Sequence, residues 1–482
     1  MLFNSLDFCV YLPCVFILYW FIFSRQLRAQ NALIAVASYV FYGWWDWRFL
    51  LLIFFSTLVD YTVARKIFAS SDSRYRKRLL TVSLITNLGL LGFFKYYNFF
   101  VSAFTDAFTL FGQRLDGHTL SIILPVGISF YTFQTLSYTI DVYRKKLPAS
   151  GDFIQFSAFV SFFPQLVAGP IERATSLLPQ FGAPRKFEYD NAMVGVKQIL
   201  WGLFKKMVVA DNCAVFVNQI FDQSENMTGS SLLLGAVFFA FQIYGDFSGY
   251  SDIAIGTARL FGFSLMRNFA YPYFARDVAE FWRRWHISLS TWFRDYLYIP
   301  LGGSRGGKGQ QIRNTFLIFL VSGFWHGANW TFIVWGLLHA LYFLPLLLTR
   351  RNRRHLNDVA ANSTLPGARE ALHIAATFFL VTLAWVFFRA DSVNHAITYL
   401  AGMADASLFA IPDFSGRQNA AIVSLWIIVM LSLEYAGRHH DVPLLAFDYR
   451  VPSRLRFGLY YLFAISIFLF AGREQAFIYF QF

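Results

Sequence analysis

Two histidines lie in sequence contexts where a titratable side chain is costly. His326 lies within an apolar run, 316–336, that is long enough to cross a bilayer, and His286 lies among tryptophans and arginines at 280–290. An ionisable group inside a membrane marks a functional site by default, because such a group is expensive to bury in lipid. Imidazole also takes up and releases a proton near neutral pH. The two histidines therefore predict proton-transfer chemistry within a membrane protein, with both as catalytic residues.

The neighbours of His326 predict a cleft. Gly327 leaves space beside the imidazole, and Trp325 and Trp330 can form a rigid wall, with Trp325 as a substrate contact. Asn329 comes three residues later, on the same face of a continuous helix. Its amide can stabilise a developing oxyanion, which makes it a second substrate-binding candidate. The alternative is a histidine that only satisfies a hydrogen bond in the core.

His286 has two cationic neighbours. Arg283 and Arg284 disfavour the imidazolium and should keep His286 neutral, so that it can accept a proton. Trp285 is adjacent and is a further substrate-binding candidate. The alternative is a Trp/Arg helix that anchors at the membrane surface and contains His286 by chance.

Two other polar positions deserve separate predictions. Asp246, with Asp252, lies at the end of an apolar segment and can orient a histidine or cap the next helix, of which capping is the commoner role. Asp246 is therefore a weaker candidate for the substrate site. His339 follows His326 by thirteen residues, which turns it away from the His326 face of a continuous helix, so we predict a structural role.

A glycine-rich loop at 302–309 contains chance matches to two catalytic motifs. G-x-S-x-G and G-x-x-x-x-G-K both occur in it, but neither follows a predicted strand, and Gly309 stands where the second motif needs Ser or Thr. Arg305, Lys308 and Arg313 give the loop a positive charge. Arg305 is a candidate for binding the phosphates of an anionic donor, although a solvated surface loop is the commoner reading.

The composition indicates an all-α polytopic membrane protein with a single domain, 1–482. The 482 residues are 56% hydrophobic and only 14% charged, whereas soluble domains have about 25% charged residues. The net charge of +13 does not indicate a nucleic-acid partner, because the basic residues flank apolar segments. The three cysteines have neither metal-ligand nor disulfide-framework spacing, so no metal site is predicted.

Apolar segments long enough to cross a membrane recur about eleven or twelve times. They lie near 7–24, 31–43, 47–64, 79–103, 119–140, 152–168, 192–219, 230–247, 313–346, 369–389, 421–436 and 456–471. The 313–346 run is too long for one crossing, and Gly323, Gly327 and Gly336 are the predicted break points. The charged and aromatic stretch 276–298 predicts an interfacial or re-entrant helix pair.

Three basic clusters predict the orientation. Short basic loops between apolar segments are typical of the cytoplasmic side. The clusters are Arg65, Lys66, Arg74, Arg76, Lys77 and Arg78; Arg144, Lys145 and Lys146; and Arg350, Arg351, Arg353 and Arg354.

Seven motifs taken together resemble the membrane-bound O-acyltransferases, and among them the bacterial alginate O-acetylation branch. Their core lies within 120–346, and the resemblance extends almost from end to end. The motifs are residues 130–144 (FYTFQTLSYTIDVYR), 163–171 (FPQLVAGPI), 242–252 (QIYGDFSGYSD), 280–290 (EFWRRWHISLS), 293–303 (FRDYLYIPLGG), 323–330 (GFWHGANW) and 477–482 (FIYFQF).

The resemblance implies a ring of membrane helices around a central funnel. It places the catalytic histidine of the family at His326 and the second family histidine at His286. The implied reaction transfers an acyl group from a thioester to a hydroxyl, without a bound cofactor. In this branch the group is acetyl from cytoplasmic acetyl-CoA, and it is passed to an extracellular polysaccharide such as alginate.

The resemblance also implies a setting for that reaction. The protein is expected in the bacterial inner membrane, with the lipid bilayer, a periplasmic acetyltransferase and a polysaccharide export complex as partners. D-alanyl or other acyl transfer to a cell-envelope polymer remains an alternative. From other classes, the alternatives are a transporter that uses intramembrane histidines as a proton relay, and a non-catalytic scaffold.

Overall fold

The computed structural model describes residues 1–110, 119–167, 169–361, 363–448, 451–471, 475, 477 and 478. All regular secondary structure in these ranges is helical, which confirms the all-α prediction. The chain forms two compact units, Met1–Met193 with Thr257–Met266, and Val194–Gly256 with Arg267–Phe482. The prediction of one domain over 1–482 stays a prediction.

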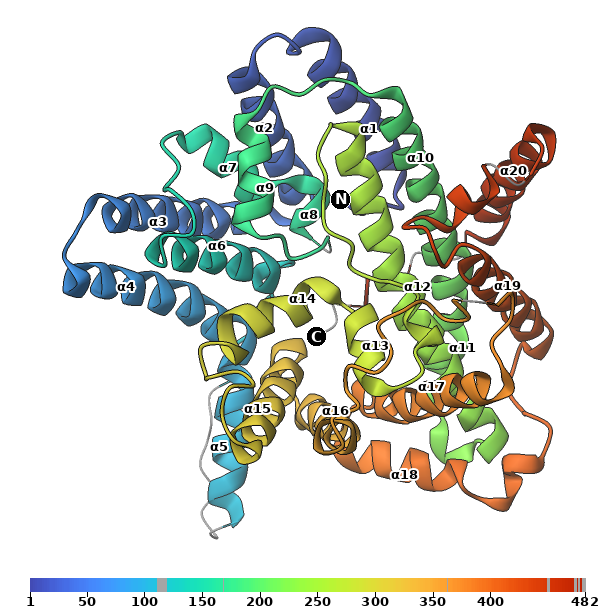
Figure 1. Ribbon diagram of the computed structural model, residues 1–482. Helices are drawn as coiled ribbons and strands as arrows, with labels where there is room; N and C mark the ends of the chain where they lie inside the picture. Colours follow the sequence, from blue (N-terminus) through green and yellow to red (C-terminus); the bar gives the residue numbers. More distant parts are fainter. Residues whose placement is uncertain are drawn as a thin grey trace. The chain divides into compact units, whose positions relative to one another are not determined.

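The first unit is a set of packed helices. Helix α3 lies beside α4 and α6, and α2 packs against α7 (Figure 1). The helices are α1 (Leu6–Ile17), α2 (Leu27–Asp46), α3 (Leu50–Ala69), α4 (Ser73–Leu91), α5 (Tyr97–Leu110), α6 (Ile128–Tyr143), α7 (Phe153–Ser161), α8 (Phe163–Leu166), α9 (Ala174–Gly182) and the start of α10 (Tyr189–Leu203), with shorter turns η1 (Leu18–Ile22), η2 (Trp47–Phe49) and η3 (Gly92–Tyr96).

Two predicted basic clusters meet in this unit. Arg76, at the start of α4, donates a hydrogen bond of 2.5 Å to the carbonyl of Tyr143, at the end of α6. A cavity of about 480 Å³ between these helix ends is lined by Arg76, Lys145 and Lys146. The clusters at 65–78 and 144–146 therefore lie at the same end of the unit, as the prediction of a shared side of the membrane requires.

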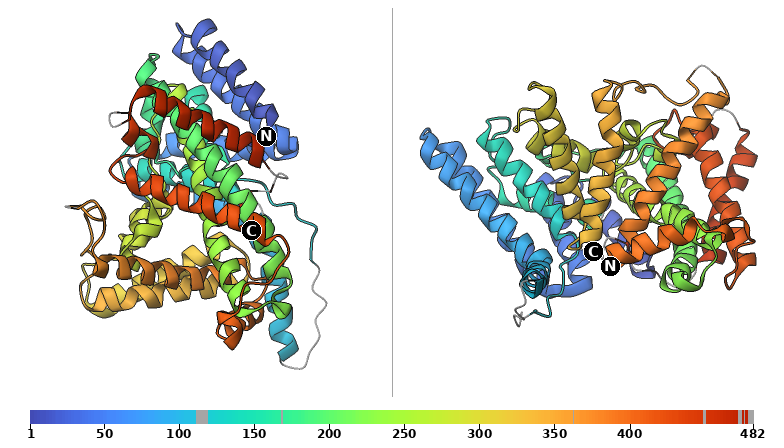
Figure 2. Two further views of the ribbon diagram at one scale, coloured as in Figure 1. Left: turned by 90° about the vertical axis from the view of Figure 1, so that its right-hand side faces the viewer. Right: turned by 90° about the horizontal axis from the view of Figure 1, so that it is seen from below.

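The second unit contains the two histidines. Its helices are α11 (Asp211–Asp222), α12 (Gly229–Leu260), α13 (Val278–Arg284), α14 (Ile287–Phe293), α15 (Lys308–His326), α16 (Trp330–Leu348), α17 (Ala368–Arg389), α18 (Val393–Met403), α19 (Arg417–Ala436) and α20 (Ser453–Phe470), with shorter turns η4 (Phe204–Ala210), η5 (Ser224–Asn226), η6 (Pro272–Phe274), η7 (Arg294–Tyr298), η8 (Ala406–Phe409) and η9 (Pro443–Phe447). Helices α15 and α16 lie side by side, and α16 also packs against α13 and α17 (Figures 1 and 2).

Glycines allow α12 to lie unusually close to α10. A Cβ on Gly202 of α10 would lie 2.6 Å from the carbonyl oxygen of Gly249, and one on Gly249 would lie 2.8 Å from the carbonyl oxygen of Gly202. Any larger side chain at either position would separate the helices. The motif at 242–252 is thus partly a packing motif, which fixes the helix that lies behind the histidine site.

Seven helical stretches of the described chain are long and apolar enough to cross a membrane. They are Leu27–Ala69, Ser73–Phe108, Gly229–Leu260, Trp330–Leu348, Ala368–Arg389, Arg417–Ala436 and Ser453–Phe470. The stretch Leu27–Ala69 has 43 residues, and one crossing needs about 20. The predicted segments 119–140, 152–168 and 192–219 instead form shorter or interrupted helices, because hydropathy reports burial without distinguishing lipid from protein.

Candidate functional site

The structure brings His286 and His326 together. Their ring centroids lie 6.3 Å apart, and both side chains are buried. His286 lies between α13 and α14, and His326 is the last residue of α15. Forty sequence positions separate them, so the pair is a product of the tertiary fold. Two imidazoles at this separation are close enough to act on one bound substrate.

The predicted long run at 313–346 is two helices. Helix α15 ends at His326, and α16 begins at Trp330. Of the three glycines predicted as break points, Gly327 makes the break, with an extended backbone after the last helical residue. A Cβ on Gly327 would overlap the Phe332 ring, so any larger residue there would force that buried ring to move.

Gly323 and Gly336 have a different role, because they lie within α15 and α16 where the two helices cross. A Cβ on Gly323 would overlap the carbonyl oxygen of Phe332 and lie 3.1 Å from its carbonyl carbon. A Cβ on Gly336 would likewise overlap the carbonyl oxygen of Phe319. The crossing is therefore closer than any side chain at these positions would permit, and it sets where the end of α15 places His326.

An aromatic wall surrounds His326. The ring of Trp325 lies 4.9 Å away, that of Trp335 5.1 Å and that of Phe388 5.4 Å, measured between centroids. Trp325 also lies 5.9 Å from His286, so it is the predicted site residue that adjoins both histidines. Trp330, the other predicted wall residue, is 57% exposed.

Asn329 is not beside His326 on one helical face. Because α15 ends at His326, Asn329 becomes the N-cap of α16: its Oδ1 accepts from Thr331 N at 3.1 Å, and its Nδ2 donates to Asp391 O at 2.9 Å. The prediction of its position assumed a continuous helix and is wrong. Its side chain satisfies backbone groups that the break in the helix exposes.

The predicted helix pair at 276–298 exists. Helices α13 and α14 meet at His286, whose φ of 44° and ψ of 54° are left-handed. This conformation costs a residue with a side chain about 1–2 kcal/mol, and such strain persists where the surroundings impose it. This strained backbone argues against the alternative in which the helix contains His286 by chance.

The arginines beside His286 point elsewhere. Arg283 donates to two carbonyls of the α16–α17 loop, each at 2.8 Å, and Arg284 donates to Glu280 at 2.9 Å. Burial raises the pKa of Glu280, but the bonds and charges of Arg276 and Arg284 outweigh it, so the pKa lies below its usual value. Both arginines therefore brace α13, and the prediction that they tune His286 directly is wrong.

Asn268 is the site residue that the sequence analysis missed. It is fully buried, and its Oδ1 lies 3.1 Å from His286 Nδ1. The same oxygen accepts from Ser288 Oγ at 2.9 Å and Ser288 N at 3.3 Å, and its Nδ2 donates to Ser251 Oγ at 3.1 Å. Asn268 lies outside every motif, in an irregular segment between Arg267 and Phe269, and nothing in the local sequence distinguishes its amide from an ordinary surface residue.

Asp246 neither orients a histidine nor caps a helix. It lies inside α12, where its carboxylate pairs with Lys206 Nζ at 2.7 Å and accepts from Ile478 N at 2.7 Å. Lys206 also pairs with Asp211 at 2.7 Å. Asp246 thus secures the end of the described chain to α12, and both of its predicted roles are wrong. The terminal motif is described only at residues 477 and 478, and its other positions lie outside the described residues.

Trp285 and His339 belong to the packed core. Trp285 is fully buried against Phe269 and Trp385, each 5.0 Å away between centroids, and does not line the cavity near the histidines. His339 accepts from Trp282 Nε1 at 3.2 Å and packs 4.9 Å from Trp335. The structural role predicted for His339 fits this geometry, although the argument from a continuous helix does not.

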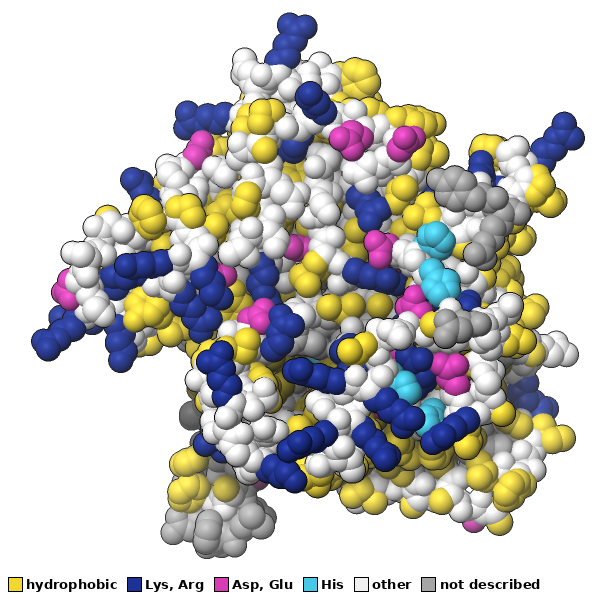
Figure 3. Space-filling view, viewed as in Figure 1, with side chains coloured by type: hydrophobic (Ala, Val, Ile, Leu, Met, Phe, Trp, Pro, Cys, Tyr) yellow, Lys and Arg dark blue, Asp and Glu magenta, His cyan; other side chains and the backbone are white. Residues whose placement is uncertain are grey.

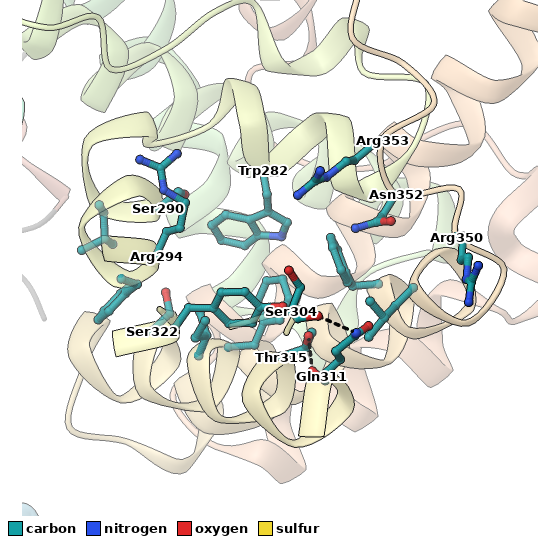
Figure 4. Close-up of a pocket in the computed structure, with 17 residues that line it drawn as sticks. Trp282, Ser290, Arg294, Ser304, Gln311, Thr315, Ser322, Arg350, Asn352 and Arg353 are labelled. Carbon is teal, nitrogen blue, oxygen red and sulfur yellow. Dashed lines mark hydrogen bonds between the residues drawn. The ribbon is translucent and has the colours of Figure 1, made fainter. Parts of the chain in front are cut away.

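A cavity of about 460 Å³ lies among α13, α14, α15 and α16 (Figure 4). Ser322 lines it and precedes His326 by one helical turn, about 6 Å of helix. Trp282 also lines it and lies 5.7 Å from Trp335, which contacts His326. The other lining residues are Leu289, Ser290, Phe293, Arg294, Tyr298, Ser304, Gln311, Thr315, Ile318, Phe319, Phe343, Leu347, Arg350, Asn352 and Arg353.

The cavity combines an apolar interior with three arginines. Arg294 comes from the end of α14, and Arg350 and Arg353 follow α16 (Figure 4). Lys and Arg side chains also gather over α13–α16 on the face shown in Figure 3. Arg305 is exposed and does not line the cavity, so the candidate phosphate contacts are these three arginines instead.

Comparison with known proteins identifies the family of the chain. Residues 39–379 match the family model of the membrane-bound O-acyltransferases. The chain belongs to this family. Because its members transfer acyl groups to hydroxyls, the protein is an O-acyltransferase of multi-pass membrane type, and the transporter and scaffold alternatives are set aside.

Several relatives in the O-acyltransferase family are similar over most of their length. A probable alginate O-acetylase AlgI of Pseudomonas syringae pv. tomato is 39% identical over 436 residues, which cover 89% of this chain and 80% of the relative. A peptidoglycan O-acetyltransferase of Helicobacter pylori is 38% identical and covers 84% and 80%. A teichoic acid D-alanyltransferase of Streptococcus thermophilus is 29% identical and covers 56% and 69%.

Proposed function

We propose that this O-acyltransferase takes acetyl from cytoplasmic acetyl-CoA and passes it across the inner membrane for O-acetylation of an extracellular polysaccharide such as alginate. The observation that carries the proposal is the close pair, His286 and His326, together with a cavity that is lined by Ser322, one helical turn before His326, and by three arginines. The donor has phosphates at one end and a thioester at the other. The three arginines of the cavity suit the phosphate end of the donor, and the apolar part of the cavity suits the remainder.

The donor is oriented by charge and shape. The phosphates of acetyl-CoA would lie against Arg294, Arg350 and Arg353, since guanidinium groups bind phosphate oxygens in a bidentate manner. The slim pantetheine arm would follow the apolar wall toward Ser322. The thioester then reaches the turn of α15 that carries His326.

The reaction needs one base and no acyl-enzyme. His326 takes the proton of the acceptor hydroxyl as the oxygen attacks the thioester carbonyl. The C–S bond then breaks, the new C–O ester bond remains, and the CoA thiolate takes up a proton. A positioned base contributes about 10²–10⁴-fold to such a step. His286 orients the donor or acceptor beside it.

Acetyl is favoured over D-alanyl as the transferred group. The acetyl-transferring relatives reported above are 38–39% identical over more than four fifths of this chain, whereas the D-alanyl relative is 29% identical over 56% of it. The alginate and peptidoglycan relatives are equally similar, so both polymers belong in the test. A periplasmic acetyltransferase and an export complex would receive the acetyl group.

The orientation follows from the basic loops. We place the clusters at 65–78, 144–146 and 350–354 on the cytoplasmic side, where short basic loops concentrate. Arg350 and Arg353 line the cavity, so this orientation opens the donor site toward the cytoplasm, where acetyl-CoA is made.

The test is the ester-linked acetate of surface polysaccharide and of peptidoglycan in a deletion strain. The strain is complemented at matched protein levels with wild type, His326→Ala, His286→Ala or, as a control, His373→Ala, which lies on α17 outside the cavity lining. We expect acetate with wild type and His373→Ala only. Full acetate with His326→Ala would refute its role as the base.

A further inference from the structure

The amide of Asn268 has one possible orientation. The backbone N–H of Ser288 lies 3.3 Å from the side-chain atom that also faces His286, and a backbone N–H can only donate. That atom must therefore be the oxygen, Oδ1. The opposite assignment would place NH₂ against the N–H of Ser288, while the present one lets Oδ1 also accept from the Ser288 hydroxyl at 2.9 Å and Nδ2 donate to Ser251 Oγ at 3.1 Å.

This orientation fixes the proton on His286. Nδ1 of His286 lies 3.1 Å from Asn268 Oδ1, which has lone pairs and no hydrogen. Two facing lone pairs would repel, so Nδ1 must carry the proton. In the neutral imidazole the other nitrogen, Nε2, is then the acceptor.

The backbone holds the same arrangement in place. Asn268 O accepts from Ile287 N at 2.9 Å, and Ala270 N donates to Arg284 O at 2.9 Å. These bonds secure the segment of Asn268 to both sides of His286, whose left-handed backbone needs such support. Behind the ring, Phe247 of α12 lies 4.7 Å away between centroids.

We propose that Asn268 is a positioning residue for acyl transfer, which holds His286 as the Nδ1–H tautomer and leaves Nε2 as its only proton-accepting atom. Asn268 touches neither His326 nor the cavity lining, so it acts through His286. The proposal rests on the proposed function, in which His286 takes part in the transfer. A tautomer that populated Nε2–H would present a donor where an acceptor is needed.

The first experiment measures the tautomer directly. Full-length protein labelled with ¹⁵N-histidine in lipid nanodiscs is compared with Asn268→Ala, and the His286 signals are identified by their loss in His286→Gln. We expect protonated Nδ1 and bare Nε2 in the wild type, and a mixture of tautomers in Asn268→Ala. A wild-type Nε2–H tautomer, or a tautomer unchanged in Asn268→Ala, would overturn the proposal.

The second experiment measures the reaction. Release of the CoA thiol from acetyl-CoA is followed in inside-out membrane vesicles between about pH 5 and 9. We expect Asn268→Ala to lower kcat about 10²-fold with little change in KM, because His286 in the wrong tautomer no longer orients the reacting group beside the base His326. Ser251→Ala, which removes the far hydrogen bond of the amide, is the control and should stay within threefold.

Asn268→Asp separates positioning from folding. A carboxylate against Nδ1–H stabilises the imidazolium, so the acid limb of the pH–rate profile should move to higher pH. A structural role alone would not move this limb, and an unmoved limb with wild-type kcat in Asn268→Ala would refute the proposal. If the wild type shows the Nδ1–H tautomer but no transfer, the proposed function fails while the tautomer assignment stands.

Discussion

The crossing of α15 and α16 should control catalysis through its glycines. Gly323→Ala adds one methyl group, whose carbon would overlap the carbonyl oxygen of Phe332 and lie 3.1 Å from its carbonyl carbon. Both of these atoms belong to the backbone of α16, so no side-chain rotation relieves the overlap. Restoring ordinary contact needs a helix shift of about 1 Å, and overpacking of this kind costs roughly 1–3 kcal/mol of stability.

The shift is transmitted to the catalytic histidine. His326 follows Gly323 by less than one helical turn, and its ring lies 6.3 Å from that of His286. A displacement of about 1 Å in a catalytic group can cost 10²-fold in rate. We therefore expect Gly323→Ala to lower kcat/KM for acetyl-CoA about 10²-fold in protein that still folds.

The assay is CoA thiol release in membrane vesicles, with the amount of folded protein measured by size-exclusion chromatography in detergent. Gly309→Ala is the matched control, because Gly309 lies on the same helix and a Cβ there meets nothing within 4 Å. It should keep wild-type activity. Gly336→Ala makes the same kind of overlap from α16 and should reproduce the loss. Wild-type kcat/KM in both Gly323→Ala and Gly336→Ala would refute the reasoning.

Two further predictions concern the donor cavity and the ion pairs of Glu280 in α13. Arg353→Glu should raise KM for acetyl-CoA by about tenfold or more and keep kcat within twofold, because a charge-assisted bond to phosphate is lost. Arg305→Glu is the control, because Arg305 lies outside the cavity lining, and it should change neither KM nor kcat. Equal effects of the two substitutions would refute the assignment of the cavity as the donor site. Glu280→Gln should lower Tm by about 5 °C at pH 7. The depressed pKa of Glu280 means that its contribution is present above the usual value of 4.5 and is lost as the pH falls through the folded-state pKa. Wild-type Tm should therefore fall toward the mutant value as the pH is lowered through the depressed pKa of Glu280, and parallel curves would contradict this.

Much of the protein could be predicted from local features of the chain. Apolar segments predict helices because a buried backbone must satisfy its own hydrogen bonds, and the described residues are helical wherever they are regular. His286 and His326 stand out because charge is costly in such surroundings. The break in 313–346 also has a local cause, since glycine tolerates the close approach of the Phe332 ring.

The errors in the predicted site share one origin. The prediction for Asn329 assumes a helix that continues past His326, and the prediction for Arg283 takes closeness to the His286 imidazole from adjacency in the sequence. The helix ends at His326, and the backbone turns left-handed at His286. One change in φ and ψ redirects every later side chain, so a spacing argument fails at the position where the site is built.

The sequence by itself determined the membrane helices, the two titratable residues and, through its motifs, the family. Only the tertiary structure decided that the histidines meet at 6.3 Å, that Asn268 Oδ1 lies 3.1 Å from His286 Nδ1, and that Arg350 and Arg353 line the cavity. The physical reason is the separation along the chain over which each property is decided. Helix formation and burial depend on neighbours within a few turns, whereas these contacts join segments 18 to 60 or more residues apart, and their geometry depends on which helix crosses which and how closely.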